Sequence, residues 1–498
     1  MHGGIHYKSN KFLTFNEPIK ELSGFKIHKF NLYGHIGSPA VPVVKIGDKV
    51  KMGQIIAIGQ DKISINIYSS VSGKILDINN IYIIIENDFS DEYISLNKLE
   101  NPNGTEILAR IKEAGIIGMG GAGFPTYSKY ETDKKIETLI INGAECEDYL
   151  TTDDLIMSKY SAEVLQGAIL LAKILDIKNV IVGIEKDKKE AIKFMKESAK
   201  LFSLKQNIDI NPKIIIKPIK SKYPQGAEKM IIQTLTGKEV PFNSLPADIG
   251  IIVNNVHTAY SVYRAVFFGE PCIKRVITIS GRAVVNKGNY LVRMGSSVAD
   301  VFCSAGGASY NSKKLDIYKE FAKGRLKACE KLANKMHATE DLKEKKQIEI
   351  KLKQEIKDTN REIYKHYVIA VDGCENNLVK ILAGGVFMGI QIDEEYCIEA
   401  RTSAILFLAE SEVENHVPTA CINCKKCAGV CPVSIQPMQI NNYAEIKNFE
   451  ECKKLNVMSC IECGACSYVC PAKIPLAYNM KMVKKSVKNL AKIKNNFL

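Results

Sequence analysis

The hydrophobic pattern in the second fifth of the chain predicts helices that alternate with strands. Apolar positions at helical spacing predict amphipathic helices over 106–114 and 164–175. Short runs rich in β-branched residues predict buried strands over 137–141 and 179–184. Such alternation is typical of a doubly wound α/β sheet. Ligands bind these sheets beyond the carboxyl ends of the strands, so the residues after 141 are candidate ligand contacts.

Residues 30–90 show a different pattern, in which short β-rich runs are separated by glycine turns. This pattern predicts a small barrel-sandwich. It is similar to lipoyl and biotinyl carrier domains, and Lys62 lies near the place where those domains carry their modified lysine. The alternative is the same sandwich without a prosthetic arm, and we favour it because Lys62 is one lysine among many.

Length and composition bound the function. A chain of 498 residues is long enough for about three or four domains of ordinary size. The formal charge of +13 suggests nucleic acid or an anionic membrane surface. The lysines are spread along the chain, which favours a general compositional bias instead, and we expect no nucleic-acid partner. We expect no signal peptide and no membrane-spanning segment, because the apolar runs, such as 403–409, fall short of the ~18 residues that a span requires.

The segment 311–367 interrupts the pattern. It contains no proline, a single glycine at Gly324, and a high density of Lys and Glu. This composition predicts a helical hairpin or a long charged helix. Two interpretations remain open, a solvated helical excursion without chemistry and a docking element for a partner protein.

Nine of the fifteen cysteines lie between Cys421 and Cys470. Eight of them form two copies of C-x2-C-x2-C-x3-C-P, a spacing that holds [4Fe–4S] clusters. In this motif three thiolates converge on one cluster, and the cysteine before proline ligates the other. The predicted ligand sets are therefore Cys421, Cys424, Cys427 and Cys470 for one cluster, and Cys460, Cys463, Cys466 and Cys431 for the second. The alternative is a pair of zinc sites, which also use C-x2-C spacing. We interpret Cys452, which lies outside the pattern, as an ordinary thiol.

A glycine-rich loop precedes the first strand of the predicted sheet. Five glycines fall within 115–123, so side chains are scarce and backbone amides can approach a phosphate. The alternative is a bare tight turn, because the spacing matches neither common nucleotide-binding glycine motif. The turn 142–148, after the strand, adds an amide and several carboxylates.

Four motifs, at 118–129, 142–147, 223–228 and 253–256, resemble those of the flavin-bearing subunit of respiratory complex I, in the same order. In that family the glycine loop and paired asparagines cradle FMN, and the acidic turn helps to place the flavin and a nicotinamide. The resemblance implies FMN or NADH contacts at Gly118, Gly120, Gly121, Gly123, Lys129, Asn142, Glu145, Glu147, Glu228, Asn254 and Asn255.

The chain resembles the RnfC family, a component of the Rnf ion-translocating electron transport complex, over nearly its whole length, including 3–6, 35–37, 69–73 and the Cys-Pro repeats. The resemblance implies a modular α/β protein. We expect an N-terminal barrel-sandwich at 1–100, an FMN- and NAD-binding α/β domain at 101–272, a β-grasp (SLBB-like) module at 273–400 interrupted by the insertion at about 311–367, and an α-helical two-[4Fe–4S] ferredoxin-like domain at 401–498.

The resemblance also implies the activity. The expected function is electron transfer between NAD(H), FMN and two [4Fe–4S] clusters within an ion-translocating ferredoxin:NAD oxidoreductase, on the cytoplasmic face of the cell membrane. The expected partners are the other subunits of that membrane complex and a ferredoxin-like carrier. Two alternatives remain: a soluble NADH-dependent reductase that feeds a cobalamin or proline reductase, and a scaffold whose flavin site is degenerate.

Two residues depart from the family pattern beside the expected flavin site. Asp148 stands where proline is usual, and His257 where a small or acidic residue is usual. We interpret His257 as a satisfied loop histidine and not as a proton donor.

Overall fold

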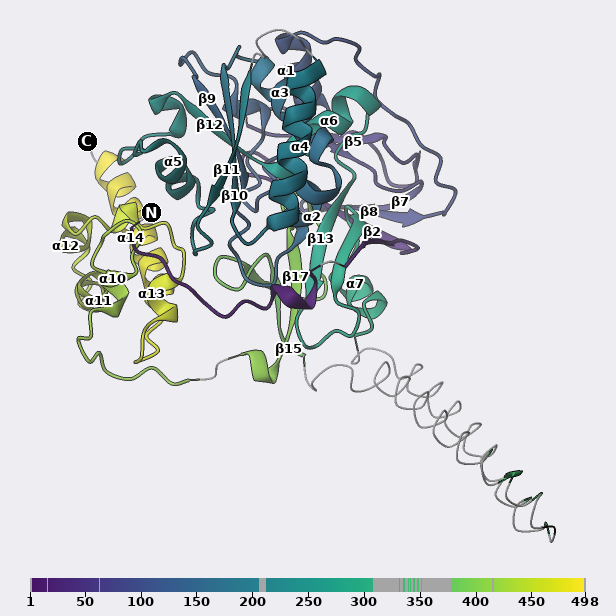
Figure 1. The fold of residues 1–498 in the computed structure, drawn as a ribbon. Helices are drawn as coiled ribbons and strands as arrows, with labels where there is room; N and C mark the ends of the chain where they lie inside the picture. Colours follow the sequence, from purple (N-terminus) through teal and green to yellow (C-terminus); the bar gives the residue numbers. More distant parts are fainter. Residues whose placement is uncertain are drawn as a thin grey trace.

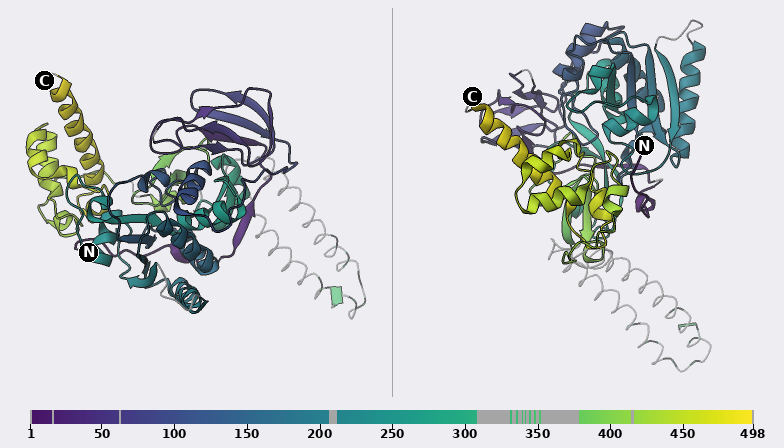
Figure 2. Two further views of the ribbon diagram at one scale, coloured as in Figure 1. Left: turned by 90° about the horizontal axis from the view of Figure 1, so that it is seen from above. Right: turned by 90° about the vertical axis from the view of Figure 1, so that its left-hand side faces the viewer.

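The structure is a computed structural model that describes residues 2–307 except 16, 62 and 206–211, residues 378–496 except 414 and 415, and isolated positions in between. Figure 1 shows the described elements, and Figure 2 shows that the N-terminal sandwich and the C-terminal helical module lie on opposite sides of a central α/β domain. Lys62 and, apart from isolated positions, the expected insertion at 311–367 fall outside the described residues.

The N-terminal module consists of two small antiparallel sheets that pack face to face. The first has the strand order β2-β8-β7-β4 and the second β3-β5-β6. Burial alternates residue by residue along β2 and β8, as expected for strands with one face toward a core. The bounds are β2 (Ile27–Asn31), β3 (Val41–Pro42), β4 (Lys49–Val50), β5 (Ile55–Ile58), β6 (Ile67–Tyr68), β7 (Gly73–Ile78) and β8 (Tyr82–Asn87).

The central domain contains a parallel sheet with the order β11-β10-β9-β12. The strands β10 and β11 are added on one side of β9, and β12 is added on the other, so the strand order reverses between β9 and β12. The helices α1, α3 and α6 cover one face and α5 covers the other. The strands are β9 (Thr138–Gly143), β10 (Asn179–Glu185), β11 (Lys213–Ile219) and β12 (Ile251–Asn255). The helices are α1 (Gly104–Glu113), α2 (Thr152–Lys159), α3 (Ser161–Lys173), α4 (Lys189–Lys205), α5 (Glu228–Thr236) and α6 (Val256–Phe268).

Two helices of this domain begin where their sequences provide caps. The Asn103 side chain accepts from the Glu106 amide at 3.0 Å, and the Glu106 carboxylate accepts from the Asn103 amide at 2.7 Å, which satisfies two amides at the start of α1. Asn255 caps α6 by accepting from the amide of His257 at 2.8 Å. The predicted elements at 106–114, 137–141, 164–175 and 179–184 correspond to α1, β9, α3 and β10.

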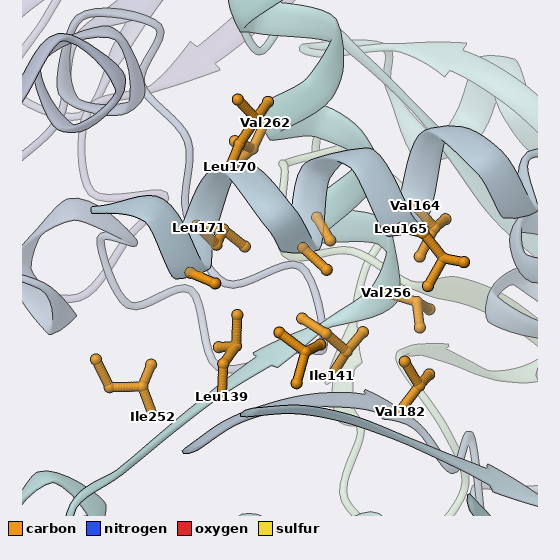
Figure 3. Close-up of a cluster of buried hydrophobic side chains, with 14 of the residues drawn as sticks. Leu139, Ile141, Val164, Leu165, Leu170, Leu171, Val182, Ile252, Val256 and Val262 are labelled. Atoms are coloured by element: carbon orange, nitrogen blue, oxygen red, sulfur yellow. The ribbon is translucent and has the colours of Figure 1, made fainter. Parts of the chain in front are cut away.

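The main core lies between this sheet and the pair α3 and α6. Figure 3 shows Leu139 and Ile141 of β9 facing Leu171 of α3, and each of these side chains is fully buried. Burial of one such side chain contributes roughly 1.5–3 kcal/mol. The two helices pack closely because Gly167 lacks a side chain: a Cβ there would lie 1.8 Å from the carbonyl oxygen of Ala259. This packing fixes the start of α6 over the ends of β9 and β12.

A mixed six-stranded sheet with the order β1-β14-β13-β17-β15-β16 forms the third module. Its edge strand β1 comes from the N-terminal segment and pairs in parallel with β14. Its central strand β17 is buried at every position and extends to residue 409, beyond the boundary that we expected at 400. The elements are β1 (Ile19–Leu22), β13 (Lys274–Ser280), β14 (Gly288–Arg293), α7 (Val298–Ser304), β15 (Leu378–Ala383), β16 (Ile390–Ile392) and β17 (Ala404–Ala409).

The C-terminal module is helical. Its core contains Ile440, Val457 and Met480, each fully buried, together with Cys452. The Cys452 thiol donates to the Ile440 carbonyl oxygen at 3.5 Å, and among the described residues this is its only side-chain hydrogen bond. The helices are α10 (Lys426–Gly429), α11 (Pro437–Glu445), α12 (Phe449–Lys454), α13 (Ala465–Tyr468) and α14 (Leu476–Asn496); short 3-10 helices lie at η1 (Lys11–Leu13), η2 (Tyr127–Lys129), η3 (Pro246–Ile249), η5 (Glu410–Glu412) and η6 (Val457–Ser459).

Candidate functional site

The carboxyl ends of β9 and β12 form the point at which the strand order of the parallel sheet reverses. Asn142 and Asn255, the last or nearly last residues of these strands, are direct register partners. The side-chain Nδ2 of Asn142 donates to the carbonyl oxygen of Gly226 at 2.8 Å. The turn before α5 therefore lies against one side of this reversal. A crevice outside such a reversal is the usual ligand position in open α/β sheets.

The glycine loop lies above this reversal. Gly118 and Phe124 close the loop through a 2.7 Å backbone hydrogen bond, and the crest at Gly120 and Gly121 is exposed. A Cβ on Gly120 would lie 3.3 Å from the Asn255 side chain. Gly121 and Gly123 have φ angles of +96° and +68°, which favour glycine. The loop therefore presents backbone without side chains toward the ends of the strands, as a phosphate or flavin cradle requires.

The other predicted flavin contacts divide into two groups. Lys129 contacts Glu228 at 3.3 Å and donates to the carbonyl oxygen of Val253 at 2.8 Å, so it lies beside the start of α5 and the end of β12. Asn254 points the other way: it is 3% exposed and donates to the Tyr130 hydroxyl at 2.6 Å. Of the paired asparagines, the structure therefore brings only Asn255 to the glycine loop.

Both predicted acidic residues of the turn have protein partners. Glu145 accepts from the backbone amides of Asp153 at 2.7 Å and Asp154 at 3.3 Å, at the start of α2. Glu147 accepts from the amides of Phe387 at 3.1 Å and Met388 at 2.9 Å, in the third module. Burial raises the pKa of Glu147 to about 7, although these two hydrogen bonds oppose the rise.

Sequence reasoning missed Asp153. Its carboxylate accepts a hydrogen bond from the side-chain Nδ2 of Asn255 at 2.6 Å, and burial together with the charge of Glu145 raises its pKa to about 7. A half-buried carboxylate with a raised pKa beside a ligand cradle is typical of functional sites. Its only signal in the sequence is its position soon after a strand end.

Sequence reasoning also missed the N-terminal segment, which runs along the acidic turn. The Tyr7 hydroxyl donates to the Cys146 carbonyl oxygen at 2.7 Å, and the ammonium of Lys11 donates to the Glu145 carbonyl oxygen. Asp148, noted above as a departure, accepts from the Asn10 amide at 2.6 Å and from its side chain at 2.8 Å. Asp148 therefore anchors this segment and does not face the cradle.

His257 corrects one expectation. It lies in the first turn of α6 and not in a loop, and it is 2% exposed. Its ring Nδ1 has no hydrogen-bond partner among the described residues. Burial holds its pKa well below the ordinary value, with a further contribution from Arg275, so the ring is neutral.

The eight predicted cluster ligands line two separate cavities in the C-terminal module. One cavity, of about 200 Å³, is lined by Cys421, Cys424, Cys427 and Cys470, and the other, of about 20 Å³, by Cys431, Cys460, Cys463 and Cys466. Each cavity thus combines three cysteines of one repeat with the last cysteine of the other. Within the described part of the chain, no three His, Cys, Asp or Glu side chains converge on a site for a single metal ion.

The loops around these cavities suit iron–sulfur ligation. Asn423 and Glu462 have positive φ angles of 54° and 58°. Their amides donate to the sulfur atoms of Cys421 and Cys460, each at 3.4 Å. Such hydrogen bonds to sulfur adjust cluster potentials. Four thiols around each cavity, with amides directed at sulfur, fit a [4Fe–4S] cluster.

The two cysteine sets differ in exposure and in neighbours. Cys424 is exposed, whereas Cys431, Cys463 and Cys466 are buried. The buried set abuts the central domain, because the Tyr223 hydroxyl donates to the Cys463 carbonyl oxygen at 2.6 Å. The ring of Phe387 stacks on that of Tyr223, with centroids 4.3 Å apart. The buried cysteine set therefore contacts the module that contains the glycine loop, and the exposed set lies toward solvent.

Three family models match the chain. They are the RnfC barrel sandwich hybrid domain at residues 1–96, the Nuo51 FMN-binding domain at 111–264 and a 4Fe-4S dicluster domain at 371–474. The C component of the proton-translocating ferredoxin:NAD(+) oxidoreductase complex of Clostridium ljungdahlii is 34% identical over 91% of this chain and 86% of its own length. The chain belongs to the RnfC family.

Other members of the family match at similar levels. The corresponding component of the Na(+)-translocating ferredoxin:NAD(+) oxidoreductase complex of Acetobacterium woodii is 30% identical over 97% of this chain and 96% of its own. That of the ion-translocating oxidoreductase complex of Rhodobacter capsulatus is 30% identical over 97% of this chain and 82% of its own. Among solved structures, an NAD+-reducing [NiFe]-hydrogenase aligns with 41% of this chain and 39% of its own, at 24% identity and a TM-score of 0.38.

These matches confirm the predicted family and the modular fold class, with a barrel-sandwich, an FMN-binding α/β domain and a dicluster domain in that order. Among the helices of the described residues, none combines the length and the apolar character that a bilayer span requires.

Proposed function

We propose that this chain is the NAD(H)-, FMN- and iron–sulfur-bearing component of an ion-translocating ferredoxin:NAD oxidoreductase complex. Membership of the RnfC family supports this proposal, together with the FMN-binding and 4Fe-4S domains that the chain contains. FMN, when bound, exchanges a two-electron hydride with NAD(H) and single electrons with iron–sulfur centres. The other subunits of the complex and a ferredoxin-like carrier are the proposed partners, and the cytoplasmic face of the membrane is the proposed location.

The observation that carries the proposal is the contact between the acidic turn and the buried cysteine set. Glu147 of the turn accepts hydrogen bonds from the backbone amides of Phe387 and Met388, and the ring of Phe387 stacks on that of Tyr223. The Tyr223 hydroxyl in turn donates to the carbonyl oxygen of Cys463. This continuous contact keeps the edge of the glycine-loop site adjacent to one predicted cluster, as short-range electron transfer requires.

Individual residues have distinct proposed roles. The exposed crest of the glycine loop, with Asn142 and Asn255 below it, would hold the flavin, and Lys129 would place a positive charge beside it. Asn255 and Asp153 would fix the geometry below the crest through their 2.6 Å hydrogen bond. The crossed sets that line the two cavities would ligate the clusters. The module boundaries given above complete the proposal, with the last one moved to the end of β17 at residue 409.

Anaerobic purification followed by flavin and iron analysis tests this function. We expect one FMN per chain, together with iron and sulfide for two clusters, and bleaching of the cluster absorbance when NADH is added. A protein with full clusters but no FMN would refute the flavin mechanism and favour the scaffold alternative. An anaerobic pull-down from membranes then separates the two electron-transfer alternatives: integral membrane partners are expected, and their absence would favour a soluble reductase.

A further inference from the structure

A second cavity lies behind the glycine loop, between α6 and the start of β13. Its volume is about 310 Å³, within the range of sites for small ligands. None of the residues predicted to contact FMN or NADH lines it. Met119, between the glycines of the loop, forms part of its wall together with His257 and Arg275. The cavity is therefore separate from the flavin cradle, although the two share the loop.

Two buried polar groups on its wall lack partners. Arg275 is 1% exposed, and its Nη2 has no hydrogen-bond partner among the described residues. The other nitrogens of this guanidinium donate to backbone carbonyl oxygens only: Nε to Val276 at 3.2 Å, and Nη1 to Met119 at 3.3 Å and to Ala400. His257 leaves its Nδ1 unpartnered on the same wall. Buried polar groups are nearly always paired, so these two are available to form hydrogen bonds with a molecule bound in the cavity.

The sign of the charge on this wall identifies the class of ligand. Burial lowers the pKa of Arg275 to about 10, so the guanidinium is charged at neutral pH. Arg264 and Lys274 also line the cavity, and both pair with Glu270, at 2.6 Å and 2.8 Å. The lining thus holds three cations and one carboxylate; Asp153, outside the lining, acts on Arg275 electrostatically but forms no ion pair with it among the described residues. A buried cation without a paired anion is strongly unfavourable, and a bound anion would remove this cost.

Most of the remaining wall is apolar. Ile116, Val276, Leu291 and Tyr260 line it, so only part of an occupant can be charged. We propose that this cavity binds a small organic anion, a carboxylate or phosphate ester with an apolar body, whose charged end pairs with Arg275. Its apolar body would lie against Met119 and therefore on the underside of the glycine loop.

The test uses the whole protein with its clusters intact and the flavin site saturated with FMN, so that the cradle cannot bind the probe. Phenyl phosphate is titrated anaerobically by calorimetry, with inorganic phosphate and phenol as probes that carry only the anionic end or only the apolar body. We expect one phenyl phosphate per chain, and an affinity at least roughly tenfold higher than that of either partial probe. Absence of binding, or equal binding of inorganic phosphate, would overturn the proposal.

Two variants locate the binding. Arg275→Met removes the charge, and Ser261→Phe fills the cavity from α6, whose Ser261 lines it. Each is expected to weaken phenyl phosphate at least roughly tenfold, whereas Lys193→Met, which removes a cation from α4 away from the cavity, leaves affinity unchanged. Unchanged binding in Ser261→Phe would refute the site. If either variant fails to fold, a crystal structure of the wild type with phenyl phosphate decides, because the phosphate must lie against Arg275.

Discussion

Cys431 provides the sharpest test of how the clusters are held. In the sequence it follows Cys427 within the first repeat, but in the structure it lines the cavity of Cys460, Cys463 and Cys466. It is 7% exposed. Cys431→Ala is therefore expected to destroy the cluster of the second repeat and spare that of its own repeat. The iron content should fall from about eight to about four atoms per chain.

Iron content alone does not show which cluster survives. The two cysteine sets differ in solvent exposure, and this difference distinguishes the clusters. Cys424 is exposed, so the cluster of its set is open to solvent, whereas three of the four cysteines of the other set are buried. In Cys431→Ala the remaining iron should be removed quickly by a hydrophilic chelator. In the reciprocal variant Cys470→Ala it should be removed slowly. Cys452→Ala, which removes a buried thiol that lines neither cavity, should keep all of the iron.

The assay combines iron and sulfide analysis with EPR of the dithionite-reduced proteins and the time course of chelation under anaerobic conditions. The reverse order, with slow chelation in Cys431→Ala and fast chelation in Cys470→Ala, would show that each repeat holds its own cluster. Loss of all iron in both variants, with Cys452→Ala intact, would show that the clusters cannot form independently. The first result would refute the crossed assignment, and the second would refute the prediction that one cluster survives without the other.

Three further predictions concern the contacts that join the acidic turn, the third module and the C-terminal module. The pKa of Glu147 rises from 4.5 to about 7 on folding, so the unfolded chain loses this proton first and stability falls by about 3 kcal/mol as pH rises through that window. Glu147→Gln should flatten the decline in Tm between pH 4.5 and 7, and an unchanged slope would contradict this. Gly385→Ala places a Cβ 2.1 Å from the Glu147 carboxylate and should lower the unfolding free energy by about 1–3 kcal/mol, measured by denaturant titration. Tyr223→Phe removes the donor to the Cys463 carbonyl oxygen but keeps the ring, and should lower stability by about 1 kcal/mol; a Tm equal to that of the wild type would show that this hydrogen bond contributes nothing.

The parts that sequence predicts well depend on local spacing. The end of the strand at 137–141 predicts the place of Asn142 at the ligand edge of the sheet, whereas Asn255, its register partner, was indicated only by the family resemblance. The cysteine repeats predict which thiols line each cavity, because their fixed spacing brings three thiols of one repeat together. The family resemblance added the order of the modules, which the family models confirm.

The parts that sequence does not predict depend on contacts between distant residues. Nothing local indicates that β1 joins the sheet of β14, or that Asn10 and Asp148 form hydrogen bonds. Asp153 becomes a neighbour of Asn255 only through the packing of α2 beside the strand ends. His257 was misjudged for the same reason, since the first turn of α6 that contains it is buried by packing against the rest of the domain.

The N-terminal segment has a consequence for the order of folding. The Gly4 amide donates to the Val430 carbonyl oxygen at 2.7 Å, and Ile5 pairs with Tyr223, so both residues contact partners that are synthesised much later than they are. These contacts cannot form until the second half of the chain has emerged, and closing so long a loop is slow. The loop around Val430 is thus covered by a segment that must wait, unpaired at Gly4, until this part of the C-terminal module has been synthesised.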